Sequence, residues 1–107
     1  LEGGAGMGAI LTMTYEKSAY TLTDIGTYLA FKRNLGLAPL VNSGELLLNV
    51  YSVIAISPER HPGTHKNWAN KLIEFLTSKE IQDFIGSYGL DDYGVALFTP
   101  ARGQEPR

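Results

Sequence analysis

The sequence contains no cysteine, which excludes disulfide scaffolds, thiol nucleophiles and cysteine-ligated zinc. It has no run of about 18 apolar residues, the length that a membrane-spanning helix needs, so we expect no transmembrane segment. An excess of one charge is also missing, because 9 basic and 11 acidic residues leave a formal net charge of -2. Lys and Arg are scattered along the chain. We therefore expect no nucleic-acid partner.

The composition that remains is that of an ordinary globular protein, with 44% hydrophobic and 19% charged residues in a chain of 107. We expect residues 1–100 to form a single α/β domain, or a fragment of a two-lobed protein. The polar residues 101–107 are predicted to be a disordered tail. The chain opens with Leu-Glu-Gly-Gly and no initiator Met, so we interpret it as a fragment.

Hydrophobic periodicity predicts helices over residues 8–17, from Asp24 to about residue 33, over 64–77 and from Ser78 to about Tyr88. Strands are predicted at 19–23, at 37–41 and most clearly at 50–57, with a short extended piece at 98–100. The order of helix, strand, helix, strand, helix, helix indicates the α/β class.

The glycine-rich turn before the first predicted helix is the first candidate binding site. Amide groups at the start of a helix have no partner within the helix, and the helix dipole favours an anion there. Gly6 and Gly8 would let an oxyanion approach the amides of Met7, Gly8 and Ala9, since neither carries a Cβ. The alternative interpretation is a flexible glycine turn with no ligand.

A second set of hydroxyl donors surrounds Asp24. Thr23 would lie at the carboxyl end of a strand, where open α/β sheets bind their ligands. Thr27 would lie in the first turn of the next helix, where it either donates to an anion or helps to close the turn. Asp24 itself would repel an anion and fits a helix N-cap. Thr21 is interpreted as a residue of a half-buried strand.

No other group of residues indicates catalysis or a cofactor. His61 and His65 flank Pro62-Gly63, so no single helix face presents both rings, and no metal site is predicted. The GGAGMG run lacks the residues that complete a nucleotide-binding motif. We find no nucleophile and base in a suitable context, so we expect no enzyme activity.

Three segments in this order are fairly specific as a set: GMGAILTMTYEKSAYTLTDIGTYLAFK, ELLLNVYSVIAISPERHPG and LTSKEIQDFIGSYG. They resemble the C-terminal half of tungstate-binding proteins of ABC transporters, which are two-lobed periplasmic binding proteins related to molybdate-binding proteins. The resemblance spans residues 4–100. It implies a partial type II-like binding-protein fold, roughly the second lobe and a return to the first. It also implies tungstate or molybdate as ligand, an ABC permease as partner, and a periplasmic or extracellular, membrane-associated location.

Two features depart from that family. Ile25 stands where the family usually has a basic residue after Thr-Asp, and the first lobe with its Thr/Ser-rich loop is absent from the sequence. A non-binding fragment or degenerate paralogue therefore remains an alternative, as does the effector-binding domain of a transcription regulator. Because the first lobe is missing, we also expect the chain to self-associate through its last two predicted helices.

Overall fold

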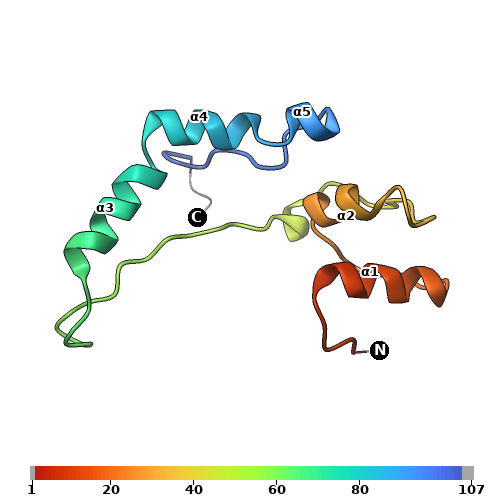
Figure 1. The fold of residues 1–107 in the computed structure, drawn as a ribbon, viewed down its shortest axis with the longest axis horizontal. Coiled ribbons are helices and arrows are strands. Elements are labelled where there is room, and N and C mark those ends of the chain that lie inside the picture. Colours follow the sequence, from red (N-terminus) through yellow and green to blue (C-terminus); the bar gives the residue numbers. More distant parts are fainter. Residues whose placement is uncertain (1, 105–107) are drawn as a thin grey trace. The chain divides into compact units, whose positions relative to one another are not determined.

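The computed structural model describes residues 2–104, and Figure 1 shows their fold. The helices are α1 (Met7–Glu16), α2 (Ile25–Phe31), the 3-10 helix η1 (Glu45–Leu47), α3 (Lys66–Leu76), α4 (Lys79–Ser87) and α5 (Leu90–Tyr93). They belong to two compact units, one ending at Glu45 and one beginning at Leu46. Each unit is described by itself.

In the first unit, α1 packs against α2 around a very small core. Leu11 is only 2% exposed and Thr14 only 7%. The Thr14 hydroxyl is satisfied by donating to the Ile10 carbonyl at 2.8 Å, so its burial leaves no unpaired polar group. A Cβ on Gly8 would lie 2.5 Å from Cζ of Phe31, so glycine at position 8 lets the Phe31 ring approach α1 without shifting.

The second unit is held together at the junction of α3 and α4. Ser78 caps α4 by accepting from the Ile81 amide at 3.4 Å. The Gln82 side-chain amide donates to the Leu76 carbonyl at 2.9 Å, while the Arg102 guanidinium donates to the Thr77 carbonyl. These donors satisfy carbonyl groups that the end of α3 would otherwise leave unpaired.

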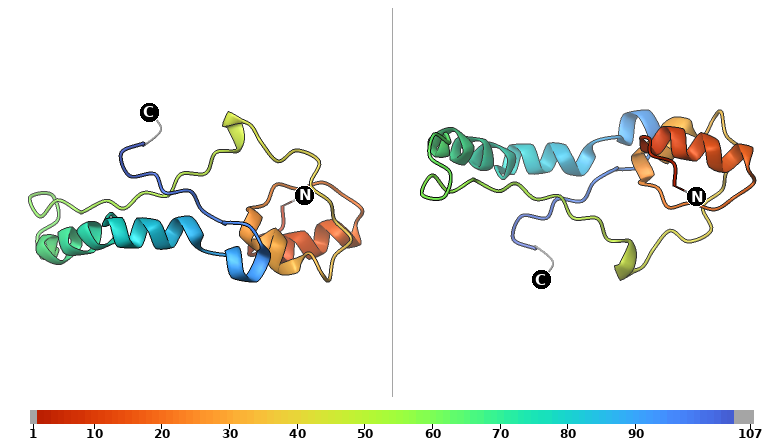
Figure 2. Two further views of the ribbon diagram at one scale, coloured as in Figure 1. Left: turned by 90° about the horizontal axis from the view of Figure 1, so that it is seen from above. Right: turned by 90° about the horizontal axis from the view of Figure 1, so that it is seen from below.

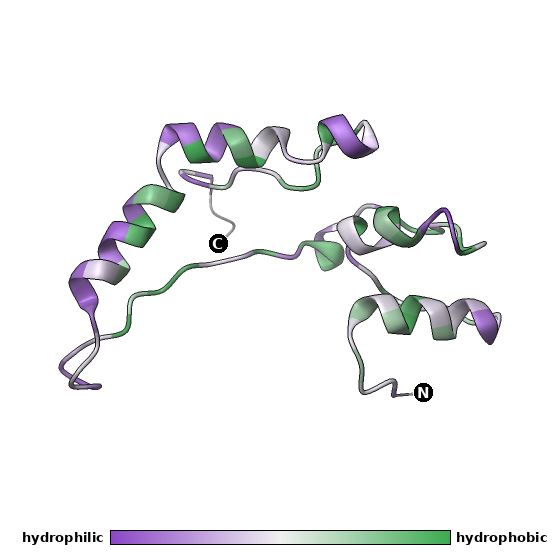
Figure 3. Cartoon of the chain, in the orientation of Figure 1, coloured by the Kyte–Doolittle hydropathy of each residue, from purple (hydrophilic) through white to green (hydrophobic). Residues whose placement is uncertain are grey.

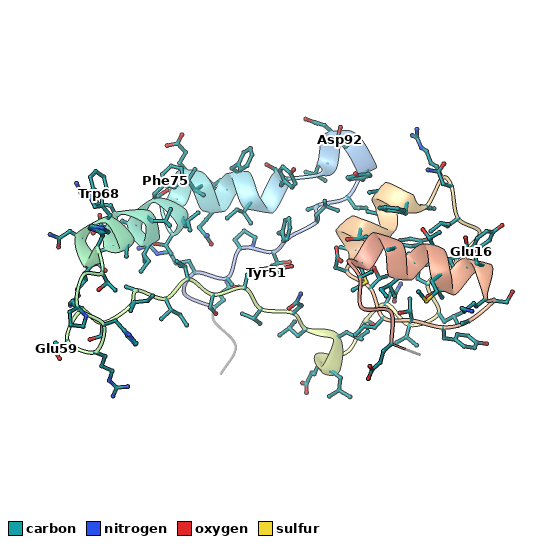
Figure 4. All side chains as sticks on the ribbon, turned by 60° about the horizontal axis from the view of Figure 1, so that its bottom comes forward. Glu16, Tyr51, Glu59, Trp68, Phe75 and Asp92 are labelled. Carbon is teal, nitrogen blue, oxygen red and sulfur yellow. The ribbon has the colours of Figure 1, made fainter. Side chains whose placement is uncertain are left out.

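Four aromatic rings in the second unit connect α4, the C-terminal segment and the segment before α3. Ring centroids lie 5.8 Å apart for Phe84 and Tyr88, 6.2 Å for Tyr88 and Phe98, and 6.1 Å for Tyr51 and Phe98. Figure 4 labels Tyr51, which lies on the extended segment beside the C-terminal return. Such ring pairs stabilise a fold by about 0.5–1.5 kcal/mol beyond their burial. The ring pair of Tyr51 and Phe98 holds the segment before α3 against the C-terminal segment.

The predicted strands differ from the structure. Residues 19–23, 37–41, 50–57 and 98–100 contain no strand, and residues 2–104 form helices, turns and irregular chain instead of the predicted α/β arrangement. The physical reason is that a strand exists only when a neighbour completes its hydrogen bonds. The first residue of the predicted strand 19–23 bonds to a helix instead of a strand. The amide of Ala19 donates to the Thr14 carbonyl at 2.9 Å and closes the end of α1.

The predicted disordered tail lies partly outside the described residues. Residues 105–107 are not described, and within 101–104 the backbone amide of Arg102 donates to Oε1 of Gln82 at 3.3 Å. Sequence reasoning missed this contact because it joins residues twenty positions apart. Among residues 2–104, every helix is too short to cross a bilayer as an apolar span.

Candidate functional site

The first turn of α1 presents backbone donors without acceptors. Gly6 is the N-cap, its backbone is extended (φ -65°, ψ 162°), and no side chain caps the helix. The first helical hydrogen bond runs from the Ile10 amide to the Gly6 carbonyl at 3.1 Å. Within the described residues, the amides of Met7, Gly8 and Ala9 therefore donate to no acceptor. No acidic residue lies in this turn, so nothing there repels an anion.

The two glycines of this turn differ in what surrounds them. A Cβ at Gly6 would meet no atom within 4 Å, so that side of the turn is open. Gly8 faces the Phe31 ring, and its missing Cβ serves the packing of α2 on α1. Sequence analysis predicted that both glycines lie beside an oxyanion, because neither carries a Cβ. The structure gives Gly8 a packing role, which sequence spacing alone does not show.

The start of α2 is already occupied by Asp24. Its Oδ2 accepts from the Thr27 amide at 2.8 Å, which confirms the predicted N-cap. The Thr27 hydroxyl donates to the same carboxylate, 2.8 Å from Oδ1 and 3.0 Å from Oδ2. The Thr23 hydroxyl donates to the Asp24 carbonyl at 3.1 Å. Both threonine donors are thus engaged locally, and the Asp24 carboxylate adds a negative charge at this helix start.

The pKa of Asp24 is lowered from its ordinary value, first because the Thr27 amide donates to the carboxylate and also because the Thr27 hydroxyl does; partial burial opposes the shift. A carboxyl with a lowered folded-state pKa contributes stability above its unfolded pKa of about 3.9. That contribution is lost as the pH falls through the lower folded value.

Replacing this cap tests its role. We expect Asp24→Ala to lower the free energy of unfolding of the first unit by about 1 kcal/mol at neutral pH, because the Thr27 amide loses its acceptor. The difference from the parent chain should shrink as the pH falls through the folded pKa of Asp24, because the protonated carboxyl is a weaker acceptor. Urea denaturation followed by circular dichroism at several pH values measures this. A difference that stays constant down to low pH would contradict it.

A hollow of about 150 Å³ lies beside α1 in the first unit. It is lined by Gly3, Ile10, Met13, Thr14, Lys17, Ala19, Tyr20 and Thr21. Sequence reasoning missed Lys17 and gave Thr21 only a structural role. The sequence held a hint of this pair, because Lys17 directly follows the helix and lies four residues before Thr21. The structure brings the two together, since the chain turns back at Ser18 (φ 50°).

A second hollow, of about 260 Å³, belongs to the second unit. Ile54, Ile56, Thr64, His65 and Ala69 line it, and the buried Thr64 hydroxyl has no partner among the described residues. Its walls are mainly apolar, and no side chain caps α3 at His65. Within residues 2–104, no three His, Asp or Glu side chains gather in a way that could hold a metal ion.

Comparison with known proteins supplies the remaining evidence. A PBP superfamily domain matches residues 2–80. The chain is 40% identical over 100 residues to the tungstate-binding protein TupA of Peptoclostridium acidaminophilum, covering 94% of the chain and 35% of that protein. It is 38% identical over 104 residues to a candidate ABC transporter anion-binding protein of Haloferax volcanii, covering 92% of the chain and 30% of that protein.

A third relative is the tungstate-binding protein TupA of Campylobacter jejuni, 36% identical over 93 residues, which cover 83% of the chain and 35% of that protein. The chain thus spans about a third of the length of the curated relatives it matches. No solved structure matches it significantly.

Proposed function

The chain belongs to the PBP superfamily, and from this membership we propose that it forms part of the oxyanion-binding component of an ABC transporter, with tungstate or molybdate as its ligand. The observation that carries the proposal is the similarity to a tungstate-binding protein over 94% of the chain. The unpaired amides of α1 support it, because they are the kind of donor that such a ligand requires.

Tungstate and molybdate are tetrahedral dianions whose oxygens only accept hydrogen bonds. A helix start with free amides and no carboxylate can hold one face of such an ion. Met7, Gly8 and Ala9 would donate from the first turn of α1, at the open side of Gly6. The other faces would need donors from parts that the relatives have and this chain does not span. Binding requires no bond to be made or broken, so the proposed role is not catalytic.

The location and partner follow from the same role. A binding component of this kind would act in the periplasm or outside the cell, at the membrane, and would deliver its ion to an ABC permease. In the complete protein, residues 50–57 would pair with neighbouring strands and give the α/β lobe that their composition predicts. The described residues would then be a partial type II-like binding-protein lobe.

A non-binding paralogue is the second candidate, and the start of α2 favours it. Both hydroxyls proposed to donate there, those of Thr23 and Thr27, already donate to Asp24. Ile25 follows the cap and offers no charge to an anion. If α2 contributes to the ligand shell of the relatives, this chain would have lost that contribution.

A chimera distinguishes the two candidates. In the Peptoclostridium acidaminophilum relative, residues 4–100 of this chain would replace the matching region, and tungstate, molybdate and sulfate would be titrated by calorimetry. We expect the chimera to bind tungstate and molybdate at least about tenfold more tightly than sulfate, a difference of about 1.4 kcal/mol. The chain alone should bind weakly or not at all, because an incompletely satisfied dianion is costly to take from water.

The control for the chimera is the same protein with Ile25→Arg. If the parent chimera folds but fails to bind tungstate while the Ile25→Arg chimera binds it, the non-binding paralogue is the correct description. If neither folded chimera binds tungstate, the oxyanion proposal is wrong for this chain. Circular dichroism of each chimera establishes that it is folded.

A further inference from the structure

The segment between η1 and the turn before α3 is unusually apolar and unprotected. Residues 46–57 contain no charged residue, no proline and no glycine. Ile54 is 82% exposed and Tyr51 74% exposed, and Figure 3 shows this segment coloured largely hydrophobic. Segments of high β propensity without charge or proline pair readily with other chains when they are exposed. This composition gives the segment a strong tendency to form a sheet.

The backbone of the same segment has no partner. In both views of Figure 2 residues 50–57 run as an extended trace. Within residues 2–104, none of their amides donates to an acceptor, and only the Ser57 carbonyl accepts, from the His61 amide at 3.0 Å. A row of free donors and acceptors on extended chain is a template for another strand. The segment therefore has both the side chains and the backbone groups of an unpaired strand.

The rest of the second unit does not cover it. From residue 46 to residue 104 no residue is buried as a whole, although the Thr64 hydroxyl is and although α3 and α4 carry apolar side chains. The contact from Phe98 reaches Tyr51 through its ring and leaves the backbone groups unpaired. From residue 46 to residue 104, the described part of the unit contains no strand with which residues 50–57 could pair.

A second copy of the chain supplies a matching strand. Pro58 cannot donate and ends the segment, and we take its last seven residues, 51–57, as the run that pairs, with Ile54 at its centre. Antiparallel pairing about this centre sets Ile54 against itself and Val53 against Ala55. Parallel in-register pairing would instead set Glu45, Glu59 and Arg60 each against its own like charge, which is unfavourable. Charge therefore selects the antiparallel arrangement.

We propose that residues 51–57 of two copies of this chain pair as antiparallel strands about a two-fold axis at Ile54, and that this pairing makes the isolated chain a dimer. The proposal rests on the segment's own backbone and side chains and is independent of oxyanion binding. It assigns self-association to this segment, whereas sequence reasoning assigned it to the last two helices.

Sedimentation of the full chain over a wide range of concentrations tests the dimer. Ile54→Lys should raise the dimer dissociation constant at least about tenfold, because two like charges would meet at the axis and the contact between the two isoleucines would be lost. Leu22→Lys is the matched control, since Leu22 is 70% exposed but lies in the first unit, and it should leave the dissociation constant unchanged.

Because the chain has no cysteine, single introduced cysteines report the register. Under mild oxidation, Ile54→Cys should form a disulfide-linked dimer, since position 54 faces itself. Ser52→Cys should not, because residue 52 faces residue 56 and the two copies of residue 52 lie about 13 Å apart along the strands. Cross-linking of both variants, or of neither, would overturn the antiparallel pairing.

Three further results would overturn the proposal. The first is a monomer at every concentration. The second is a dimer that Phe75→Glu on α3 dissociates and Ile54→Lys does not, which would assign the interface to the helices. The third is protection of the amides of residues 51–57 from hydrogen exchange that does not change with concentration, since that would show pairing within one chain.

Discussion

Leu11→Ala is expected to lower the free energy of unfolding of the first unit by about 2–5 kcal/mol, the range for removing a buried leucine side chain. Among residues 2–104, Leu11 on α1 is the buried hydrophobic residue, at 2% exposure, in the unit where α1 packs against α2. Short helices gain most of their stability from such packing and little from intrinsic propensity. With so small a core, the substitution should remove much of the helical signal of residues 7–31.

Urea denaturation followed by far-ultraviolet circular dichroism measures this loss. Leu22→Ala is the matched control, because the same chemical change at a 70% exposed position should alter the free energy of unfolding by no more than about 0.5 kcal/mol. If both variants lose the same stability, Leu11 does not hold the first unit together.

Met7→Pro in the tungstate-binding chimera is expected to weaken tungstate binding about 10- to 150-fold, the equivalent of one hydrogen bond to a charged group. Proline removes the amide hydrogen of the first helical residue, which within the described residues has no acceptor in the unliganded chain. The helix should persist, because this position favours proline and the extended backbone of Gly6 suits the residue before it.

The control for this substitution is Met7→Ala, which removes the same side chain but keeps the amide. Tungstate affinity should stay close to that of the parent chimera, and circular dichroism should show the same helix content for both variants. Equal affinity of the Met7→Pro and Met7→Ala chimeras would show that the Met7 amide does not touch the ion, and the start of α1 would then lose its proposed role.

The helices and their caps could be predicted from the sequence because their causes are local. Asp24 and Ser78 each cap a helix by accepting from an amide three residues on, which a reader of the sequence can anticipate. The predicted helix over 8–17 lies one residue from α1, and that over 64–77 contains α3. The end of α4 before Gly89 (φ 95°) was also predicted, since glycine readily adopts that backbone angle.

The strands and the donors of the site could not be predicted in the same way. A pattern such as that of residues 50–57 reports a preference for extended backbone, but whether a strand forms depends on a partner that the pattern does not contain. Thr23 and Thr27 offered hydroxyls at the right places in the sequence. Their donors are engaged by Asp24, and this depends on which way each side chain turns.

The sequence by itself determined the approximate bounds of α1 to α4, the caps Asp24 and Ser78, and the family whose motifs the chain carries, but it did not indicate η1 or α5. Only the tertiary structure decided that Gly8 serves the Phe31 ring, that the amides at the start of α1 stay free among the described residues, and that residues 50–57 lack a strand partner there. The physical reason is the distance along the chain between the groups that interact. Caps and helix periodicity involve neighbours along the chain, whereas packing and strand pairing join groups that only folding brings together.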